Sequence, residues 1–483
     1  MTRIVNLSIV FKIISRNLFI ISAALFFCGI LSLYFSETVF PFVISSIIAF
    51  VLGFLFFVLT KKRGKDAILQ QKEAYLTVTL SWIFISIIGS LPYIFSGTIP
   101  SPTDAIFESV SGFSTTGASI LTDVEILPKS ILFWRSMTHW IGGIGIIVLV
   151  IIVMPSLHIG GYHLFTLESS FREKIQPKIK AVGNRLLFIY ILLTLAEIIL
   201  LLIGKMSLFD SVCHAFGTVA TGGFSTKNSS IINYSPYIQY VVMTFMLLAG
   251  TNFLIHYYLL KNNFKKIREN EEFKFYLIVV FVIGLVVTSI LYFNLGKPLE
   301  ESFREAFFQV ISIITCTGFA SADYLLWPTA GWVIIFFIMF LGGSTGSTSG
   351  GIKMARYLIL LKNFSRIFRQ IKSPHAIIPI RLNKNMITDD ANRSILTFIS
   401  VYMMIFLIGS ISLIILGIDF KTSASSVATC MAGIGPGLGT VGPVSNFAHL
   451  PDMGKWILSL LMLIGRLEIY TFLVLFTRNY WMK

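Results

Sequence analysis

The chain has 483 residues, of which 55% are hydrophobic and only 13% are charged, and its formal net charge is +15. Soluble globular proteins carry about a quarter charged residues, so this composition excludes that class. Apolar runs of about 18 or more residues recur throughout and predict a polytopic α-helical membrane protein, whereas a β-barrel would show short alternating segments.

The excess of positive charge does not indicate nucleic acid, because the Lys and Arg residues cluster in short loops beside the apolar runs. These clusters lie at 61–65, 172–185, 261–268, 362–384 and 478–483. The positive-inside rule predicts that all of them, and with them both termini, are cytoplasmic. The four cysteines show neither a CxxC pair nor Cys/His spacing, so no disulfide framework or zinc site is implied.

Taken in order, the apolar runs predict ten transmembrane helices. They are 17–34, 40–60, 74–95, 131–155, 187–203, 237–260, 273–293, 331–361, 395–418 and 455–476. The first two form an accessory pair within residues 1–73. The other eight fall into four modules, at 74–185, 186–272, 273–385 and 386–483.

Each module contains a short apolar run between its two spans. These runs, at 105–113, 210–219, 301–314 and 419–431, each begin at or just after an acidic residue. At 1.5 Å per residue they cover only about half a bilayer, so we expect half-spanning helices. All four modules run in the same direction, which favours a pseudo-fourfold arrangement about an axis normal to the membrane over an inverted repeat.

A glycine-containing segment follows each half-span, at 114–119, 220–225, 315–320 and 432–437. Glycine can simply allow helices to pack closely, and a single copy would favour that interpretation. Four copies in equivalent positions favour a shared site, because irregular backbone survives at membrane depth only in a wet cavity or inside protein. A ring of main-chain carbonyls can replace the hydration shell of K⁺, and the negative C-terminal ends of the half-spans would favour a cation there.

The chain resembles potassium-translocating subunits of the Trk/Ktr/HKT superfamily, most of all those of the TrkH type. The resemblance covers essentially the whole chain, including the two leading spans. It rests on Thr-Thr-Gly-Ala-Ser at 115–119, Ala-Thr-Gly-Gly-Phe-Ser at 220–225, Thr-Gly-Phe at 317–319, Gly-Pro-Gly-Leu-Gly at 435–439 and Gly-Arg-Leu-Glu at 465–468.

The resemblance implies four membrane–pore–membrane modules and a potassium filter. Its glycines would be Gly117, Gly222, Gly318 and Gly435, and its carbonyls would come mainly from Thr115, Thr116, Ala220, Thr221, Cys316, Thr317, Gly433 and Ile434. Two departures concern Cys316, where the family often has Thr, and Ala432-Gly433, where relatives often have Asn-Asn. Main-chain coordination tolerates both.

Two features predict a gate. The 342–351 segment, with Gly342, Gly343, Gly346, Gly350 and Gly351, interrupts the third return span and ends before Lys353. A stable helix would not have this composition, since each Gly costs about 1 kcal/mol relative to Ala. Arg466 lies within the last apolar run, where a charge costs about 2.5–3.5 kcal/mol, so we expect it to face the pore as a barrier to cations.

These features favour gated K⁺ uptake, with a secondary transporter of another small solute as the alternative. We find no constellation of nucleophile, base or metal ligands for an enzyme. No Walker A or Rossmann fingerprint predicts a nucleotide or other organic cofactor in this chain. The resemblance implies a homodimer in the bacterial inner membrane, in contact with lipid and a cytosolic TrkA-like nucleotide-binding regulatory subunit.

Overall fold

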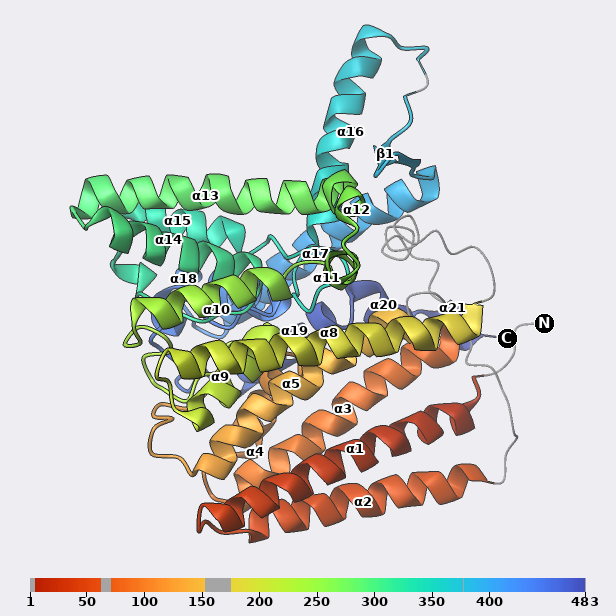
Figure 1. Cartoon of the computed structure of the whole chain (residues 1–483). Coiled ribbons are helices and arrows are strands. Elements are labelled where there is room, and N and C mark those ends of the chain that lie inside the picture. The colour runs from red at the N-terminus through yellow and green to blue at the C-terminus, as the bar shows by residue number, and fades with distance from the viewer. Residues whose placement is uncertain (1–4, 62–70, 153–174, 377, 483) are drawn as a thin grey trace.

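The computed structural model describes residues 5–61, 71–152, 175–376 and 378–482. In these ranges the chain is almost wholly helical, with one short antiparallel hairpin of β1 (Arg381–Leu382) and β2 (Asn385–Met386). Long helices lie side by side in one bundle, from which α16 (Met354–Lys372) projects (Figure 1). The predicted all-helical class is confirmed. The basic loop residues 62–65, and Arg172 and Lys174, lie outside the described residues.

The two leading helices form a hairpin. α1 (Leu7–Tyr34) and α2 (Phe40–Lys61) are joined by hydrogen bonds from Ser22 Oγ to the Ser46 carbonyl (2.9 Å) and from Ser46 Oγ to the Ser22 carbonyl (2.8 Å). α1 begins at Leu7 and not at residue 17 as predicted, because the Asn6 side chain caps the amide of Ser8 and the basic start continues the helix. Large apolar side chains on the free face of α2 are exposed, as expected of a surface toward lipid.

Four groups of helices follow, each with a short helix between longer ones. The first group is α3 (Gln71–Phe95), α4 (Pro102–Phe113) and α5 (Lys129–Ile152). The second is α8 (Ile175–Ile203), α9 (Leu208–Val219), α10 (Pro236–Ala249), α11 (Phe253–Leu260) and α12 (Phe264–Glu269). The third is α13 (Glu271–Leu295), α14 (Leu299–Ile314), η1 (Tyr324–Leu326), α15 (Thr329–Ile338) and α16. The fourth is α17 (Asp389–Ile415), α18 (Phe420–Ala432), η2 (Gly439–Val441), α19 (Asp452–Arg466), α20 (Ile469–Leu473), η3 (Val474–Phe476) and α21 (Arg478–Trp481).

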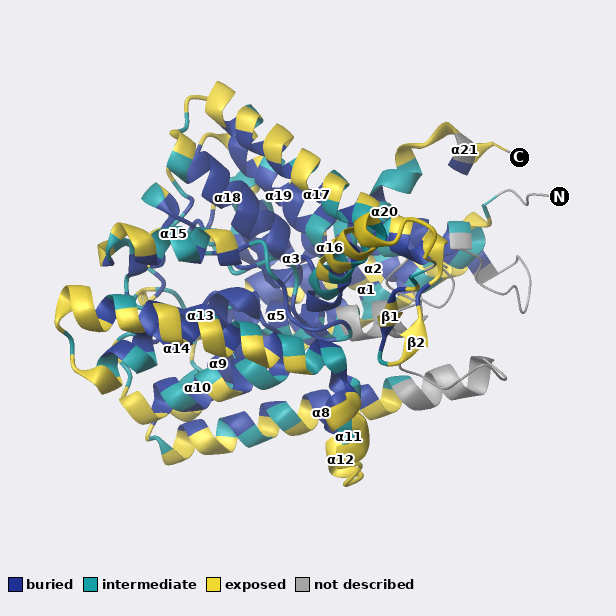
Figure 2. Ribbon diagram, turned by 90° about the horizontal axis from the view of Figure 1, so that it is seen from above, coloured by how far each residue is buried: buried dark blue, intermediate teal, exposed yellow. Residues whose placement is uncertain are grey.

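The short helices α4, α9, α14 and α18 begin where their sequences provide a start signal. Ser101 caps α4, Ser207 caps α9 and Asp419 caps α18, each by accepting from an amide three residues ahead. α14 starts after Pro298 with Glu300 and Glu301 in its first turn, where negative charge suits the helix dipole. Most of their remaining residues are buried, and α18 is almost wholly buried (Figure 2).

Two return spans that we predicted as continuous are broken. α10 and α11 meet at a 100° bend, and α19 meets the α20–η3 segment at 112°. At the first break the side chain of Asn252 caps the amide of Leu254, which starts a new helix. At the second break Glu468 adopts a left-handed backbone (φ 63°), which a continuous helix does not contain. The third return span is interrupted between Ile338 and Met354, around the predicted segment 342–351.

Six helices are long and apolar enough to cross a membrane, and two bent pairs would bring the number to eight, counting described residues alone. Ten spans therefore stay a prediction. The start of α3 and the end of the chain lie at the same end of the bundle, because Tyr480 Oη donates to the Lys72 carbonyl at 2.7 Å. The side of the membrane on which this end lies stays a prediction.

Close packing of α19 on α18 gives a stability prediction. A Cβ on Gly465 would overlap the backbone carbonyl of Met431 on α18, which cannot swing aside. A Cβ on Gly454 of the same helix would have an ordinary 3.5 Å contact with Leu413. Overpacking costs about 1–3 kcal/mol, so Gly465→Ala should lower the thermal midpoint of the purified protein, while Gly454→Ala should not. Equal midpoints for the two variants would contradict this packing.

Candidate functional site

The four short helices end in the same backbone motif. Thr115, Thr221, Cys316 and Gly433 have φ values of 53°, 55°, 56° and 74°. A left-handed conformation is unusual for a non-glycine residue and is a genuine outlier for β-branched Thr. The next amide donates back to a helix carbonyl five residues earlier, from Thr116 to Ser111, Gly222 to Gly217, Thr317 to Ser312 and Ile434 to Thr429, at 2.7–2.9 Å. This is the Schellman ending of a helix.

The residue after this amide is a glycine in all four segments. Gly117, Gly223, Gly318 and Gly435 have φ values of 81°, 79°, 84° and 93°. We predicted Gly222 as the equivalent glycine of the second segment, and that register is wrong by one residue. Gly222 occupies the position of Thr116, and Ala220 that of Ser114, because the segment contains two adjacent glycines that spacing alone did not distinguish.

The four segments meet in a closed ring. A Cβ built on Gly117 would overlap the Gly222 carbonyl oxygen, one on Gly223 the Thr317 oxygen, and one on Gly318 the Ile434 oxygen. A Cβ on Gly435 would lie 2.7 Å from the Thr116 oxygen, which closes the circle. Each glycine therefore leaves space for the carbonyl of the next segment. Only glycine fits at these four positions, because it tolerates a positive φ and has no Cβ to block the neighbouring carbonyl.

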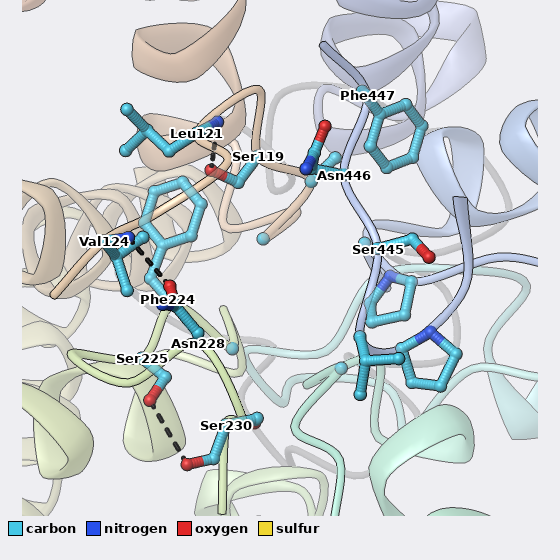
Figure 3. A pocket seen from close by; sticks show the side chains of 18 of the residues that line it. Ser119, Leu121, Val124, Phe224, Ser225, Asn228, Ser230, Ser445, Asn446 and Phe447 are labelled. Atoms are coloured by element: carbon cyan, nitrogen blue, oxygen red, sulfur yellow. Dashed lines mark hydrogen bonds between the residues drawn. The ribbon is translucent and has the colours of Figure 1, made fainter. Parts of the chain in front are cut away.

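A cavity of about 120 Å³ opens on one side of the ring (Figure 3). All four ring glycines line it, together with loop residues such as Ser119, Ser225 and Phe447 from three different segments. In the adjoining loops the Asn228 amide donates to Asp123 at 2.7 Å, which lowers the pKa of that exposed carboxyl. The cavity therefore leads from the loops to the ring. The described residues contain no group of three or more His, Cys, Asp or Glu side chains that could hold a metal ion.

Backbone and side-chain hydrogen bonds join each pair of neighbouring segments behind the ring. Arg135 Nη1 donates to the Ser225 carbonyl at 3.3 Å, and the Ala320 amide donates to Ser230 Oγ at 3.1 Å. Tyr324 Oη donates to the Gly437 carbonyl at 2.7 Å, and the Phe447 amide donates to the Ser119 carbonyl at 2.8 Å. The ring is thus supported at all four joints.

His139 on α5 contacts the end of α4 and the second segment. Its Nδ1 lies 2.7 Å from the Gly112 carbonyl, and its Nε2 lies 3.2 Å from the Phe224 amide. The carbonyl can only accept and the amide can only donate, so the His139 imidazole carries its proton on Nδ1. The sequence analysis did not include His139, Arg135 or Glu108 in the site. Like Arg466, Arg135 is a charged residue within an apolar run, and this sequence feature could have identified it.

The glycine-rich segment 342–351 lies directly against the ends of the short helices. A Cβ on Gly350 would overlap the Ala432 carbonyl, and one on Gly351 would lie 3.4 Å from Cys316 Sγ. Thr348 Oγ1 donates to the carbonyls of Val219 (3.1 Å) and Ala249 (3.3 Å). The segment therefore contacts the second, third and fourth modules at once.

Polar contacts hold both ends of this segment. Gly342 donates to the Ile352 carbonyl at 2.9 Å, and Gly343 donates to Ser349 Oγ at 2.9 Å. Glu272 Oε1 accepts from the amides of Thr345 (2.6 Å) and Ala355 (3.1 Å). Gly346 has a left-handed backbone beside Asn252.

Arg466 and Lys353 both reach this segment. Arg466 Nη1 donates to the Thr348 carbonyl at 2.8 Å, and its Nε and Nη2 have no hydrogen-bond partner among the described residues. Lys353 donates from Nζ to the Ser349 carbonyl. Arg466 is buried and lies in the last turn of α19, and its neighbour Glu468 instead pairs with Arg356 at 2.6 Å. The predicted gate residues therefore lie together.

Comparison with known proteins matches residues 39–483 to the TrkH family model, described as a cation transport protein. The chain is 37% identical over 431 residues to the Trk system potassium uptake protein TrkH of Escherichia coli, with 87% of this chain and 88% of the relative covered. It is 35% identical to the Trk system potassium uptake protein TrkG of Escherichia coli, with 94% of both covered.

A solved structure agrees with the fold of the whole chain. The crystal structure of the potassium transporter TrkH from Vibrio parahaemolyticus superposes with a TM-score of 0.89 at 30% identity, and covers 99% of this chain and 100% of its own. The family consists of transport proteins, so the prediction that the chain is not an enzyme is confirmed. The chain belongs to the TrkH family of cation transport proteins.

Proposed function

We propose that the chain takes up K⁺ across a bacterial inner membrane through a filter made by its four glycine segments. The observation that carries this proposal is the closed ring, in which each of four glycines accommodates a carbonyl of the next segment. The relatives that cover most of the chain are named potassium uptake proteins, which supports K⁺ as the ion.

The K⁺ ligands in this proposal are main-chain oxygens. With the register corrected, equivalent carbonyls come from Thr115, Thr221, Cys316 and Gly433, and from Thr116, Gly222, Thr317 and Ile434. Four short helices direct their C-terminal ends at the ring, and the negative ends of their dipoles favour a cation. Carbonyl oxygens can replace the hydration shell of the ion without any charged ligand.

The proposed architecture is two leading helices (1–73) followed by four modules around a pseudo-fourfold axis. The modules are 74–185, 186–272, 273–385 and 386–483, and the cyclic order of the ring contacts follows their order in the chain. A secondary transporter built from two inverted halves would not require four equivalent ends in a closed ring.

The gate in this proposal consists of the 342–351 segment and Arg466. The segment lies against the ring on the side away from the cavity, with Arg466 bound to its Thr348 carbonyl. A buried guanidinium with two unpaired nitrogens would repel a cation leaving the filter. Opening requires both to move, since the segment and Arg466 are hydrogen-bonded to each other.

We further propose a homodimer regulated by a cytosolic nucleotide-binding subunit. α16 carries exposed apolar side chains at spacings of three and four residues, namely Leu361, Phe364, Ile367, Phe368 and Ile371. A second copy would cover this stripe. The regulatory subunit would meet the end of the bundle with the basic clusters, which also carries the ion pair Lys384–Glu269 (2.9 Å).

Uptake of ⁸⁶Rb⁺ by cells that lack their own potassium uptake systems tests the transport function. Cells that express the wild-type chain, together with a Trk-type regulatory subunit, should accumulate the ion and grow at low K⁺. Correctly inserted protein that supports neither growth nor accumulation would contradict K⁺ uptake and favour a different solute.

Gly318 gives a test of the ring. In Gly318→Ala the new Cβ overlaps the Ile434 carbonyl, so this oxygen must leave its place in the ring and the uptake rate should fall by about tenfold or more. Gly417→Ala is the matched control, because Gly417 has the same kind of backbone (φ 88°) with nothing within 4 Å. Similar uptake by the two variants would exclude carbonyl crowding as the cause.

Arg466 gives a test of the gate. Removing the guanidinium in Arg466→Ala removes both the repulsion of cations and the bond to Thr348, so K⁺ flux into proteoliposomes without a regulatory subunit should rise. Arg478→Ala, which removes an exposed arginine, should leave the flux unchanged. Unchanged flux through the Arg466 variant would remove this residue from the gate.

A further inference from the structure

A buried ion pair lies behind the first two segments of the ring. Arg135 Nε on α5 donates to Glu108 Oε1 on α4 at 2.8 Å, and the two side chains are 3% and 0% exposed. Glu108 also accepts from Ser119 Oγ (3.0 Å) and from the Ile120 amide (3.0 Å), which holds the segment as it leaves the ring. Both oxygens of the carboxylate therefore have partners.

The other three modules have no charge at the position of Glu108. Counting eight residues back from the Schellman amides gives His214, Gln309 and Ser426. His214 Nε2 lies 3.0 Å from Ser225 Oγ, and Gln309 Nε2 donates to the Ala322 carbonyl at 3.2 Å. His214 and Gln309 thus support the outgoing segments with neutral hydrogen bonds, whereas Ser426 Oγ has no hydrogen-bond partner among the described residues. A carboxylate is thus not needed for that support alone.

Arg135 explains why the first module needs a carboxylate. Its Nη2 donates to Ser119 Oγ of the first segment at 3.2 Å, and its Nη1 donates to the Ser225 carbonyl of the second at 3.3 Å. Its guanidinium lies 4.0 Å from the centre of the Phe224 ring, a cation–π contact. The other three joints described above use neutral groups, so this joint alone among those four uses a guanidinium.

A guanidinium at this place would oppose the passage of cations if it were unpaired. Arg135 lines the same cavity as the four ring glycines, close to the path of an ion that enters the ring. At low effective dielectric a unit charge acts strongly over such distances. The carboxylate of Glu108 neutralises this charge, with its Oε1 2.8 Å from Arg135 Nε. The planar, fork-shaped guanidinium of Arg135 can therefore join two segments without raising the barrier to cations.

We propose that Glu108 and Arg135 are positioning residues that determine ion preference. The guanidinium of Arg135 fixes the spacing of the first two filter segments, and the carboxylate of Glu108 neutralises the positive charge of this guanidinium. The inference rests on the proposed K⁺ uptake. It predicts that the two residues have separable effects. The balance of their charges controls the rate of cation passage, and the planar guanidinium of Arg135 controls the preference for K⁺ over Na⁺.

The test measures ⁸⁶Rb⁺ and ²²Na⁺ uptake into proteoliposomes in an open background, Arg466→Ala, with the Arg466→Ala protein as reference. Glu108→Gln leaves the guanidinium unbalanced, so the rate for both ions should fall about tenfold or more. The double variant Glu108→Gln with Arg135→Gln should restore the rate to within about threefold of the reference, because the charge is balanced again. Its preference for Rb⁺ over Na⁺ should fall, because the fork is lost. Arg135→Lys keeps the charge without the planar guanidinium and should lower the preference for Rb⁺ over Na⁺.

Asp104→Asn is the matched control. Asp104 pairs with the buried Lys455 at 2.6 Å and joins α4 to α19, away from the ring. This variant should lose thermal stability with unchanged ion preference. The proposal would be overturned by a double variant that is as slow as Glu108→Gln or that has the same ion preference as the reference. It would also be overturned if Asp104→Asn lost as much ion preference as Arg135→Lys.

If Glu108→Gln does not fold, Arg135→Lys and Asp104→Asn still decide the role of the fork. Failure of the reference protein itself to take up ⁸⁶Rb⁺ would instead count against the proposed function.

Discussion

The ring depends on one steric relation, the contact between a glycine of one segment and a carbonyl of the next. Four such contacts, at Gly117, Gly223, Gly318 and Gly435, link the four segments into one closed ring. Each contact needs a residue without Cβ that also accepts a positive φ, so the two requirements coincide at the same positions. The helix caps and the hydrogen bonds between neighbouring segments hold these four backbones in place.

The backbone of the ring is nearly fourfold while its surroundings are not. The same Schellman hydrogen bond recurs at all four helix ends, because this bond uses only main-chain atoms and tolerates Thr, Cys or Gly at the left-handed residue. Behind it the chain places Glu108, His214, Gln309 and Ser426, which differ in charge and size. One chain with four modules can thus keep a uniform carbonyl ring and still support each segment differently, which four identical subunits could not do.

The sequence was informative where a single segment determines its own structure. The four short helices, their start signals and the glycine segment after each were predictable, because caps, helix dipoles and positive φ are local properties. The interrupted third return span was predictable for the same reason, from the composition of 342–351. The register of Gly222 and Gly223 was not, since both residues are glycine and they differ only in their folded environment: Gly222 donates to Gly217, and Gly223 has the positive φ. The breaks after Ala249 and Arg466 were missed because the runs around them are apolar on both sides, although Asn252 provides a local cap at the first break. The pairing of Glu108 with Arg135 requires the arrangement of α4 against α5, which no local pattern contains.

The ring and the segment 342–351 differ in the kind of interaction that holds them. A Cβ added at a ring glycine would meet the backbone carbonyl of the next segment, and this close approach recurs at all four joints. The segment 342–351 contains only Gly, Ser and Thr. Apart from the close approach of Gly350 to the Ala432 carbonyl, its described contacts are mostly hydrogen bonds, among them those to the carbonyls of Val219 and Ala249, to Glu272 and to Arg466. Hydrogen bonds of this kind can be exchanged for bonds to water at a net cost of about 0.5–1.5 kcal/mol each. In the proposed function the rigid ring is the filter, and the hydrogen-bonded segment in the adjacent layer is the gate. The contact of Gly350 with the Ala432 carbonyl is where one layer meets the other.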